Sequence, residues 1–368
     1  MARAKTSSQP DALQAILHAL PVLAVFITPD GMLDDPDDDV AVWTLPEFTD
    51  KGLVGNAPDR LERLIERAGH GERVQTELWY RGRARTRFPD PTRRRGLLSL
   101  TPVHDEDGLV ERIALCLVDC EDHGLPALGL RQPSRQPAAH ARVETVLDLA
   151  QAVILTDYRL RSSGTDAGSG SGGDQRREQL AARLRRCTAC SDTLSMLGRR
   201  TVAFRDLLGL AGLAGHERLD ARARDAELPV RLAPALSLLL AELADNAARF
   251  GAWSGTSGRV SVGLGRDTRD AFVLDWRESG VDARPAALRG FGMVFAQDAL
   301  PALYGGQTTL DVLPGGYHWR IGVPVTAEDA AAGRVEGSAS DATVQPEFGR
   351  FDGGFTGADT VRADGSQS

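Results

Sequence analysis

The 368-residue chain has few aromatic residues, few cysteines and no long hydrophobic run, and each absence excludes a class of protein. Aromatics make up only 5%, so we expect helices packed through leucine and alanine. No apolar run approaches the ~18–20 residues that a membrane span needs. Four cysteines behind an N-terminus without an apolar leader indicate a reducing, cytoplasmic location. A formal charge of −8 argues against nucleic-acid binding, which needs excess lysine and arginine.

The composition is that of a globular protein, with 42% hydrophobic and 26% charged residues, and the length predicts two or three domains. Residues 1–11 are polar and predicted to be flexible. Residues 12–122 contain patterns for a helix at 11–20, a strand in VLAVFI, a strand in AVWTL, a helix at 58–68 and strands from 74 to 87. LLSLTPV and LVERIALCLVD flank a His-Asp-Glu-Asp-Gly turn, which predicts a β-hairpin. These patterns predict a compact α+β unit.

A linker rich in proline and glycine is predicted at 123–137, and two amphipathic helices follow within 138–215. The first begins at Ala138 and the second runs over 174–197, with GTDAGSGSGG between them. A hairpin of two such helices leaves half of each apolar stripe exposed. We therefore expect a second copy to complete a four-helix bundle, which makes the chain a homodimer.

The third region, 216–327, combines a Leu/Ala-rich helix with antiparallel strands. The helix APALSLLLAELADNAARFG precedes the strands GRVSVGLG and AFVLDWRE. A Gly-punctuated segment, RGFG, leads into another helix and the closing strands QTTLDVL and YHWRIGVPV. This order predicts an α/β sandwich. Residues 328–368 are small, polar and aperiodic, and are predicted to be disordered.

Three polar side chains of the Leu/Ala-rich helix share one face, because Glu242, Asn246 and Arg249 are spaced by four and three residues. A carboxylate, an amide oxygen and a guanidinium suit a metal-bound polyphosphate: the amide oxygen as a Mg2+ ligand, the cation as a phosphate partner. The alternative is a solvated helix face that carries an acid–base pair.

A resemblance over 138–325 favours the first interpretation. AELADNAARFGAWS, LDWRESG, GFG and LPGGYHWRIGVPV together resemble the ATP-binding domain of HWE-type sensor histidine kinases, within the GHKL ATPase superfamily. The resemblance implies ATP and Mg2+ as ligands. It implies these roles: Asn246 as the Mg2+ ligand, Glu242 as its companion acid, Glu278 as the acceptor of the adenine amino group, Gly280 for close approach of the base, and Gly290 and Gly292 for the nucleotide lid and phosphates.

The chain departs from the family pattern at several of these positions. The histidine that usually precedes the acid of the first box is Ala241 here. The lysine and tyrosine of that box appear as Arg249 and Phe250, and the second glycine after Glu278 is Val281, which narrows the space near a nucleotide.

The phosphoacceptor helix also departs from the family. The family sequence is His-Arg-Val-Lys-Asn-Thr-Leu, and the counterpart here, ARVETVL, begins with Ala141. His140 lies one residue earlier, which is ~100° around a helix. It shares a stripe with Val143 and Leu147, so it is predicted to face the bundle seam. Alternatively, fraying of the helix near Pro137 exposes His140 as the nucleophile.

Two functions follow. In the first, a sensor kinase autophosphorylates on His140 and passes the phosphate to a response-regulator aspartate. In the second, a degenerate pseudokinase acts as a dimeric binding module for a response regulator or a partner kinase. The lack of a long apolar run and the net negative charge predict no membrane or nucleic-acid partner for either.

The N-terminal unit resembles a PAS domain through LLSLTPVHDEDGLVERIALCLVD and its position ahead of a kinase-like region. A flavin photosensor of this fold needs a cysteine where Gly55-Asn56-Ala57-Pro58 carries alanine. His18 and His70 are expected at the surface or at helix ends. We therefore expect neither flavin nor haem. The fold class predicted overall is multidomain α+β: a PAS-like domain, a helical-hairpin dimerisation domain and a GHKL-type sandwich.

Overall fold

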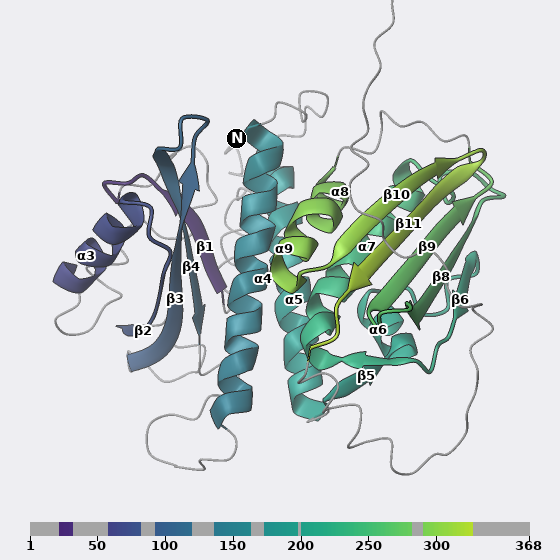
Figure 1. Cartoon of the computed structure of the whole chain (residues 1–368), viewed down its shortest axis with the longest axis horizontal. Coiled ribbons are helices and arrows are strands. Elements are labelled where there is room, and N and C mark those ends of the chain that lie inside the picture. The colour runs from purple at the N-terminus through teal and green to yellow at the C-terminus, as the bar shows by residue number, and fades with distance from the viewer. Residues whose placement is uncertain are drawn as a thin grey trace, which may run out of the picture.

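The computed structural model describes residues 22–31, 58–81, 93–119, 136–162, 173–197, 200–281 and 290–326. Within these ranges the chain forms a four-stranded and a five-stranded β-sheet separated by long helices (Figure 1), and a small two-stranded sheet. The predicted mixed α+β class is confirmed. The helix expected at 11–20, the strand AVWTL, the strand residues beyond Arg81 and the tail 328–368 lie outside the described residues.

The first sheet is antiparallel, with the strand order β1-β4-β3-β2. Its elements are β1 (Val22–Ile27), α3 (Pro58–Gly69), β2 (Val74–Arg81), β3 (Arg93–His104) and β4 (Val110–Asp119). The predicted hairpin is β3–β4. Its turn is held by the Asp105 carboxylate, which accepts the backbone N–H groups of Asp107 and Leu109, and by Gly108 at φ +81°.

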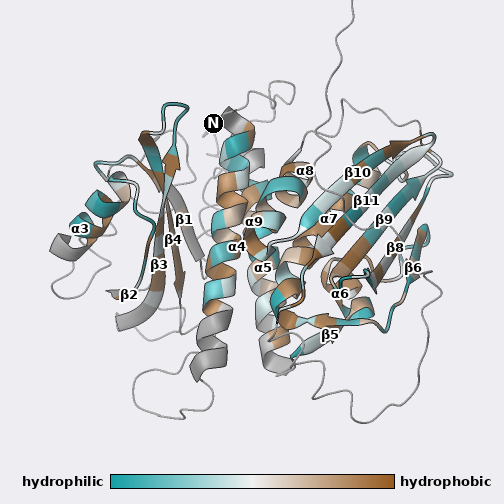
Figure 2. Ribbon diagram, viewed as in Figure 1, coloured by the Kyte–Doolittle hydropathy of each residue, from teal (hydrophilic) through white to brown (hydrophobic). Residues whose placement is uncertain are grey.

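This sheet is apolar on both faces. Alternate residues of a strand point to opposite sides of the sheet, and here both sets contain buried hydrophobic residues. Leu98 and Leu100 belong to the core beneath α3, whereas Leu97 belongs to the core that includes the long helices. Hydrophobic residues accordingly dominate β3 and β4, while polar residues line the visible face of α3 (Figure 2). The two-sided apolar pattern requires a helix on each side of the sheet.

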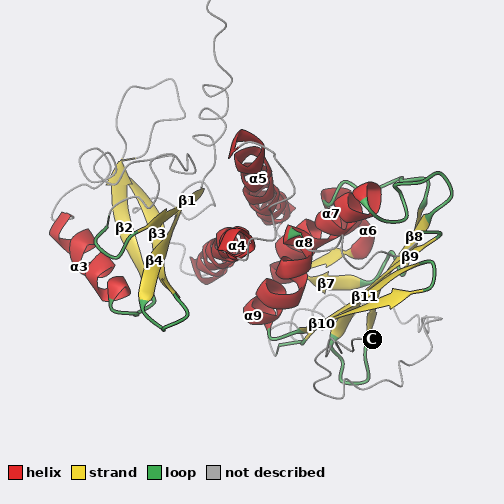
Figure 3. Ribbon diagram, turned by 90° about the horizontal axis from the view of Figure 1, so that it is seen from above, coloured by secondary structure: helices red, strands yellow, loops and turns green. Residues whose placement is uncertain are grey.

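The helix on the second side is α4 (Gln136–Ser162), which packs against α5 (Gly173–Leu197) and also contacts β1, β3 and β4. Viewed from above, α4 lies between the first sheet and the helices of the C-terminal region (Figure 3). Its buried apolar residues extend beyond one narrow stripe: Val143, Val146, Leu147, Leu149, Ala150, Ala152, Val153 and Ile154. The expectation that half of the apolar stripe of α4 is exposed was wrong, because the chain's own sheet packs against this helix. A second copy is therefore not needed to cover α4, and the homodimer stays a prediction.

The second sheet has the strand order β10-β11-β9-β8-β6. Its strands are β6 (Leu219–Arg222), β8 (Arg259–Arg266), β9 (Phe272–Ser279), β10 (Gln307–Leu313) and β11 (Gly316–Val323). All neighbours are antiparallel except β6 and β8, which run parallel. The sequence did not predict β6, nor the small sheet of β5 (Thr201–Ala203) and β7 (Glu227–Pro229).

Helices cover the inner face of this sheet. They are α6 (Phe204–Leu210), the 3-10 turn η1 (Val230–Leu232), α7 (Ala233–Arg249), α8 (Phe291–Val294), the π-helical turn η3 (Phe295–Ala299) and α9 (Leu300–Tyr304). The central helix α7 is buried almost continuously from Ala233 to Leu243. Its C-terminal half, where the burial ends, carries the candidate site.

Candidate functional site

Helix α7 carries three of the predicted site residues at increasing exposure. Glu242 is buried, Asn246 is half-buried and Arg249 is exposed at the last residue of the helix. The common face predicted from their spacing thus runs from the interior to the surface. Asn246 lies at the boundary, where an amide oxygen can still reach a ligand.

Glu242 forms an ion pair with an arginine that was not among the site residues predicted from the sequence. Arg183 of α5 donates from Nε to Oε1 at 2.9 Å and from Nη2 to Oε2 at 3.1 Å. The side chains of the arginine and the glutamate are only 14% and 10% exposed. A bidentate pair between planar groups is strong and directional. The only sequence signal was a cation beside the apolar stripe of α5, next to Leu184.

The segment around Gly292 packs directly on α7. A Cβ at position 292 would lie 2.9 Å from the Glu242 Cβ and 3.3 Å from the Asn246 Nδ2. The glycine therefore lets the start of α8 approach the two polar residues of α7. Gly290 is different: it is extended, and a Cβ there would meet nothing within 4 Å among the described residues.

Glu278 lies under the loop that follows α7. Its Oε2 accepts the backbone N–H of Ala252 at 2.8 Å, and its Oε1 accepts the Trp276 indole N–H at 3.2 Å. Burial raises the pKa of this carboxyl above its usual value, against the opposing effect of those two donors. Each oxygen can accept a second bond, so the carboxyl has both a structural role and remaining acceptor capacity.

Gly280 has a conformational and a steric reason to be glycine. Its φ is +78°, and a Cβ there would lie 3.0 Å from the Gly258 Cα. The close approach observed at this position is thus to the backbone of the loop that follows α7. The sequence had predicted an approach to a nucleotide base, which this contact leaves untested.

The side-chain oxygen atoms of α7 suit a metal ion that binds together with a phosphate ligand. Within the described ranges, no group of three His, Cys, Asp or Glu side chains is arranged to hold a metal ion. Magnesium is commonly bound through one or two protein oxygens, with phosphates and water completing its shell. Asn246 fits this kind of site as the single protein ligand, with Glu242 beside it as a companion acid once it is released from Arg183.

The candidate phosphoacceptor is only partly described. Residues 140 and 141 belong to α4, but their side chains lie outside the described part of the structure. None of the described helices is long and apolar enough to cross a membrane.

Comparison with known proteins gives matches among solved structures only. No family model matches the chain, and no curated protein is similar to it. The blue-light activated histidine kinase of Erythrobacter litoralis EL346 is similar over 84% of this chain and 97% of its own, with 14% identity and a TM-score of 0.46. Histidine kinase AdeS of Acinetobacter baumannii covers 47% of this chain and 94% of its own, with 14% identity and a TM-score of 0.28.

The catalytic domain of histidine kinase ThkA covers 35% of this chain and 97% of its own, with 15% identity and a TM-score of 0.28. These matches are histidine kinases, the class that the sequence resembles.

Proposed function

We propose that the chain is a sensor histidine-kinase-like signalling protein whose C-terminal sandwich binds ATP with Mg2+. The observation that carries the proposal is the meeting of α7 and α8 at Gly292. Glycine there brings the start of a helix against the side chains of Glu242 and Asn246, because an added Cβ would lie 2.9 Å from the Glu242 Cβ and 3.3 Å from the Asn246 Nδ2. A helix start offers backbone N–H groups to phosphate, and an amide oxygen suits the accompanying magnesium.

We assign the individual residues the roles that the family resemblance implies. Asn246 ligates Mg2+ and Glu242 orients a water or a proton beside it. Arg249, exposed at the end of α7, meets a phosphate. Gly290 and Gly292 line the phosphates. Glu278 and Gly280 face the base, with Glu278 using the acceptor capacity that Ala252 and Trp276 leave.

Calorimetric titration with ATP, ADP and a non-hydrolysable analogue, with and without Mg2+, tests nucleotide binding. We expect Mg2+-dependent binding that Asn246→Ala weakens at least tenfold. The neighbouring Asp245→Ala serves as the control, because Asp245 is exposed on another side of the same helix. Absence of any heat or thermal protection with the wild-type protein would remove the proposal.

Phosphotransfer is a separate step, and two observations favour the pseudokinase alternative. In the register of the resemblance, the acceptor position holds Ala141, and Glu242 is held by Arg183. Incubation with γ-labelled ATP and Mg2+ separates the two functions. Acid-labile label that disappears in His140→Ala identifies a kinase. ATP binding without label identifies a regulatory module for a response regulator or a partner kinase.

The N-terminal sheet is proposed as a PAS-type sensor that acts through α4. Two polar links join them. The buried Gln151 donates to Ser99 Oγ at 2.6 Å and to Thr101 Oγ1 at 2.8 Å, and the Tyr158 hydroxyl donates to Glu111 at 2.8 Å. Residues 151 and 158 are two turns apart, so both links lie on one face of α4. Light scattering of the full chain tests the proposed homodimer.

A further inference from the structure

One guanidinium group joins three helices at the candidate site. Arg183 extends from α5, pairs with both oxygens of Glu242 on α7, and lies with its Cζ 3.7 Å from the centre of the Phe291 ring on α8. The guanidinium is thus paired in its plane and stacked over an aromatic face, two modes that arginine combines well. Removing it would loosen α5, α7 and α8 at one point.

This contact commits the carboxylate of Glu242 to Arg183. Both of its oxygens accept from Arg183, and its side chain is 10% exposed. The guanidinium occupies the in-plane edge of the carboxylate that faces both oxygens, so a water or a ligand could reach Glu242 only through the remaining lone pairs. A Cβ on Gly292 would lie 2.9 Å from the Glu242 Cβ, so the space between α8 and α7 beside this ion pair is too small even for a methyl group.

We propose that Arg183 is an autoinhibitory latch: while it bridges Glu242 and Phe291, the nucleotide site is closed, and withdrawal of α5 from α7 opens it. This inference rests on the proposed nucleotide function and adds the regulation of that site. Opening frees the Glu242 carboxylate and lets the segment at Gly292 move away from Asn246. A ligand that binds only the open state then shifts the equilibrium toward it.

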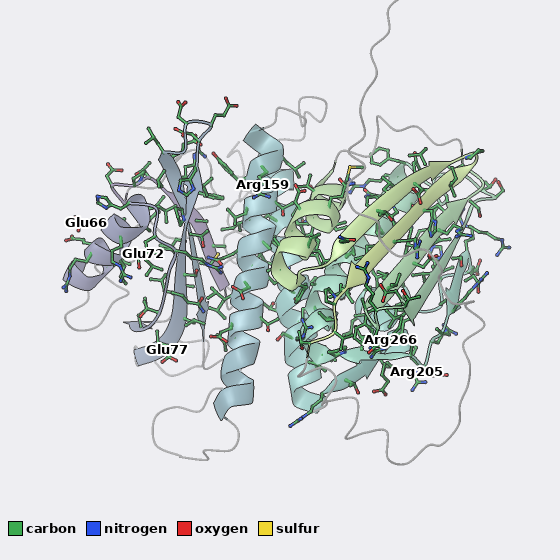
Figure 4. All side chains as sticks on the ribbon, in the orientation of Figure 1. Glu66, Glu72, Glu77, Arg159, Arg205 and Arg266 are labelled. Atoms are coloured by element: carbon green, nitrogen blue, oxygen red, sulfur yellow. The ribbon has the colours of Figure 1, made fainter. Side chains whose placement is uncertain are left out.

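The arrangement of the helices links the latch to the N-terminal sheet. Helix α4 contacts that sheet on one side and α5, α8, η3 and α9 on the other. Arg159, on the upper half of α4 in Figure 4, lies 4.0 Å from Asp298 of η3. A shift of α4 against the sheet therefore acts on α5, which carries Arg183, and on α8, which carries Phe291.

The test compares Arg183→Gln, Arg183→Ala and Arg183→Lys with Arg185→Ala in the full chain. Truncation of one partner of a buried pair is strongly destabilising, so Arg183→Gln is included to retain hydrogen bonding to Glu242. Lysine keeps the charge but loses the bidentate fork and the stacking. Arg185 lies on the same helix without an ion pair to Glu242 among the described contacts. The readouts are Mg·ADP affinity by calorimetry and hydrogen exchange over 291–304.

We expect Arg183→Gln and Arg183→Ala to bind Mg·ADP at least about fivefold more tightly, the lower end of usual coupling between sites. Exchange over 291–304 should rise in both, the lysine variant should be intermediate, and Arg185→Ala should match the wild type. If the wild type binds Mg·ADP and the Arg183 variants bind it equally or more weakly, the latch alone is overturned. No binding by any variant overturns the nucleotide function and the latch with it.

Discussion

Gly251→Ala tests the packing that holds the end of α7 to the second sheet. A Cβ at this position would lie 2.0 Å from the Glu278 Oε2 and 2.9 Å from the Ala247 Cα. The first distance cannot be relieved unless the carboxylate moves, because real contacts of a Cβ are longer. The carboxylate would then lose the Ala252 N–H, which it accepts at 2.8 Å.

The magnitude follows from two losses. A hydrogen bond to a charged group contributes about 1.5–3 kcal/mol, and an overpacked core methyl costs about 1–3 kcal/mol. Together they predict that the free energy of unfolding falls by about 2.5–6 kcal/mol, or roughly 5–25 °C in the midpoint. Tryptophan fluorescence during urea unfolding reports this region, since the Trp276 indole bonds Glu278 and the Trp253 ring lies 5.9 Å from that of Trp276.

Gly255→Ala is the matched control in the same loop, because a Cβ there meets nothing within 4 Å. It should change stability by no more than about 0.5 kcal/mol. The double variant Gly251→Ala/Glu278→Ala should be less destabilised than the sum of its single variants, because removing the carboxylate frees the space. Equal effects of the two glycine variants, or strict additivity in the double variant, would refute this account of the packing.

Two further predictions concern buried polar groups. Because burial raises the folded-state pKa of Glu278, its contribution to stability is fully present below the unfolded pKa, about 4.3, and is lost as pH rises through the higher folded value. The stability of the wild type relative to Glu278→Gln should therefore fall from pH 4 upward, and a constant difference in urea unfolding would contradict this. Gln151→Ala should cost about 1–3 kcal/mol in the same assay, because it leaves the fully buried Ser99 without that donor. Arg159→Ala should cost under about 0.5 kcal/mol, since its ion pair is exposed, and equal losses would count against the buried network.

The periodicity of the sequence predicted most elements because local rules decide them. The turn at Asp105 and Gly108 predicted the β3–β4 hairpin, and the 3.6-residue period predicted α4, α5 and α7. The strands β5, β6 and β7 were missed, since they are three or four residues long, too short to show an alternation. The predicted site residues on α7 share a side of the helix, but Arg249 is exposed whereas Glu242 is buried.

By itself, then, the sequence determined the α+β class, the long helices and the polar residues near the end of α7, since all of these depend on residues a few positions apart. Tertiary structure alone decided what those residues touch. The Arg183–Glu242 pair spans 59 positions and the Glu278–Ala252 bond spans 26, separations at which no periodicity operates. The coverage of α4 was likewise decided in space: its stripe predicted an apolar partner, and the sheet of the same chain occupies that place.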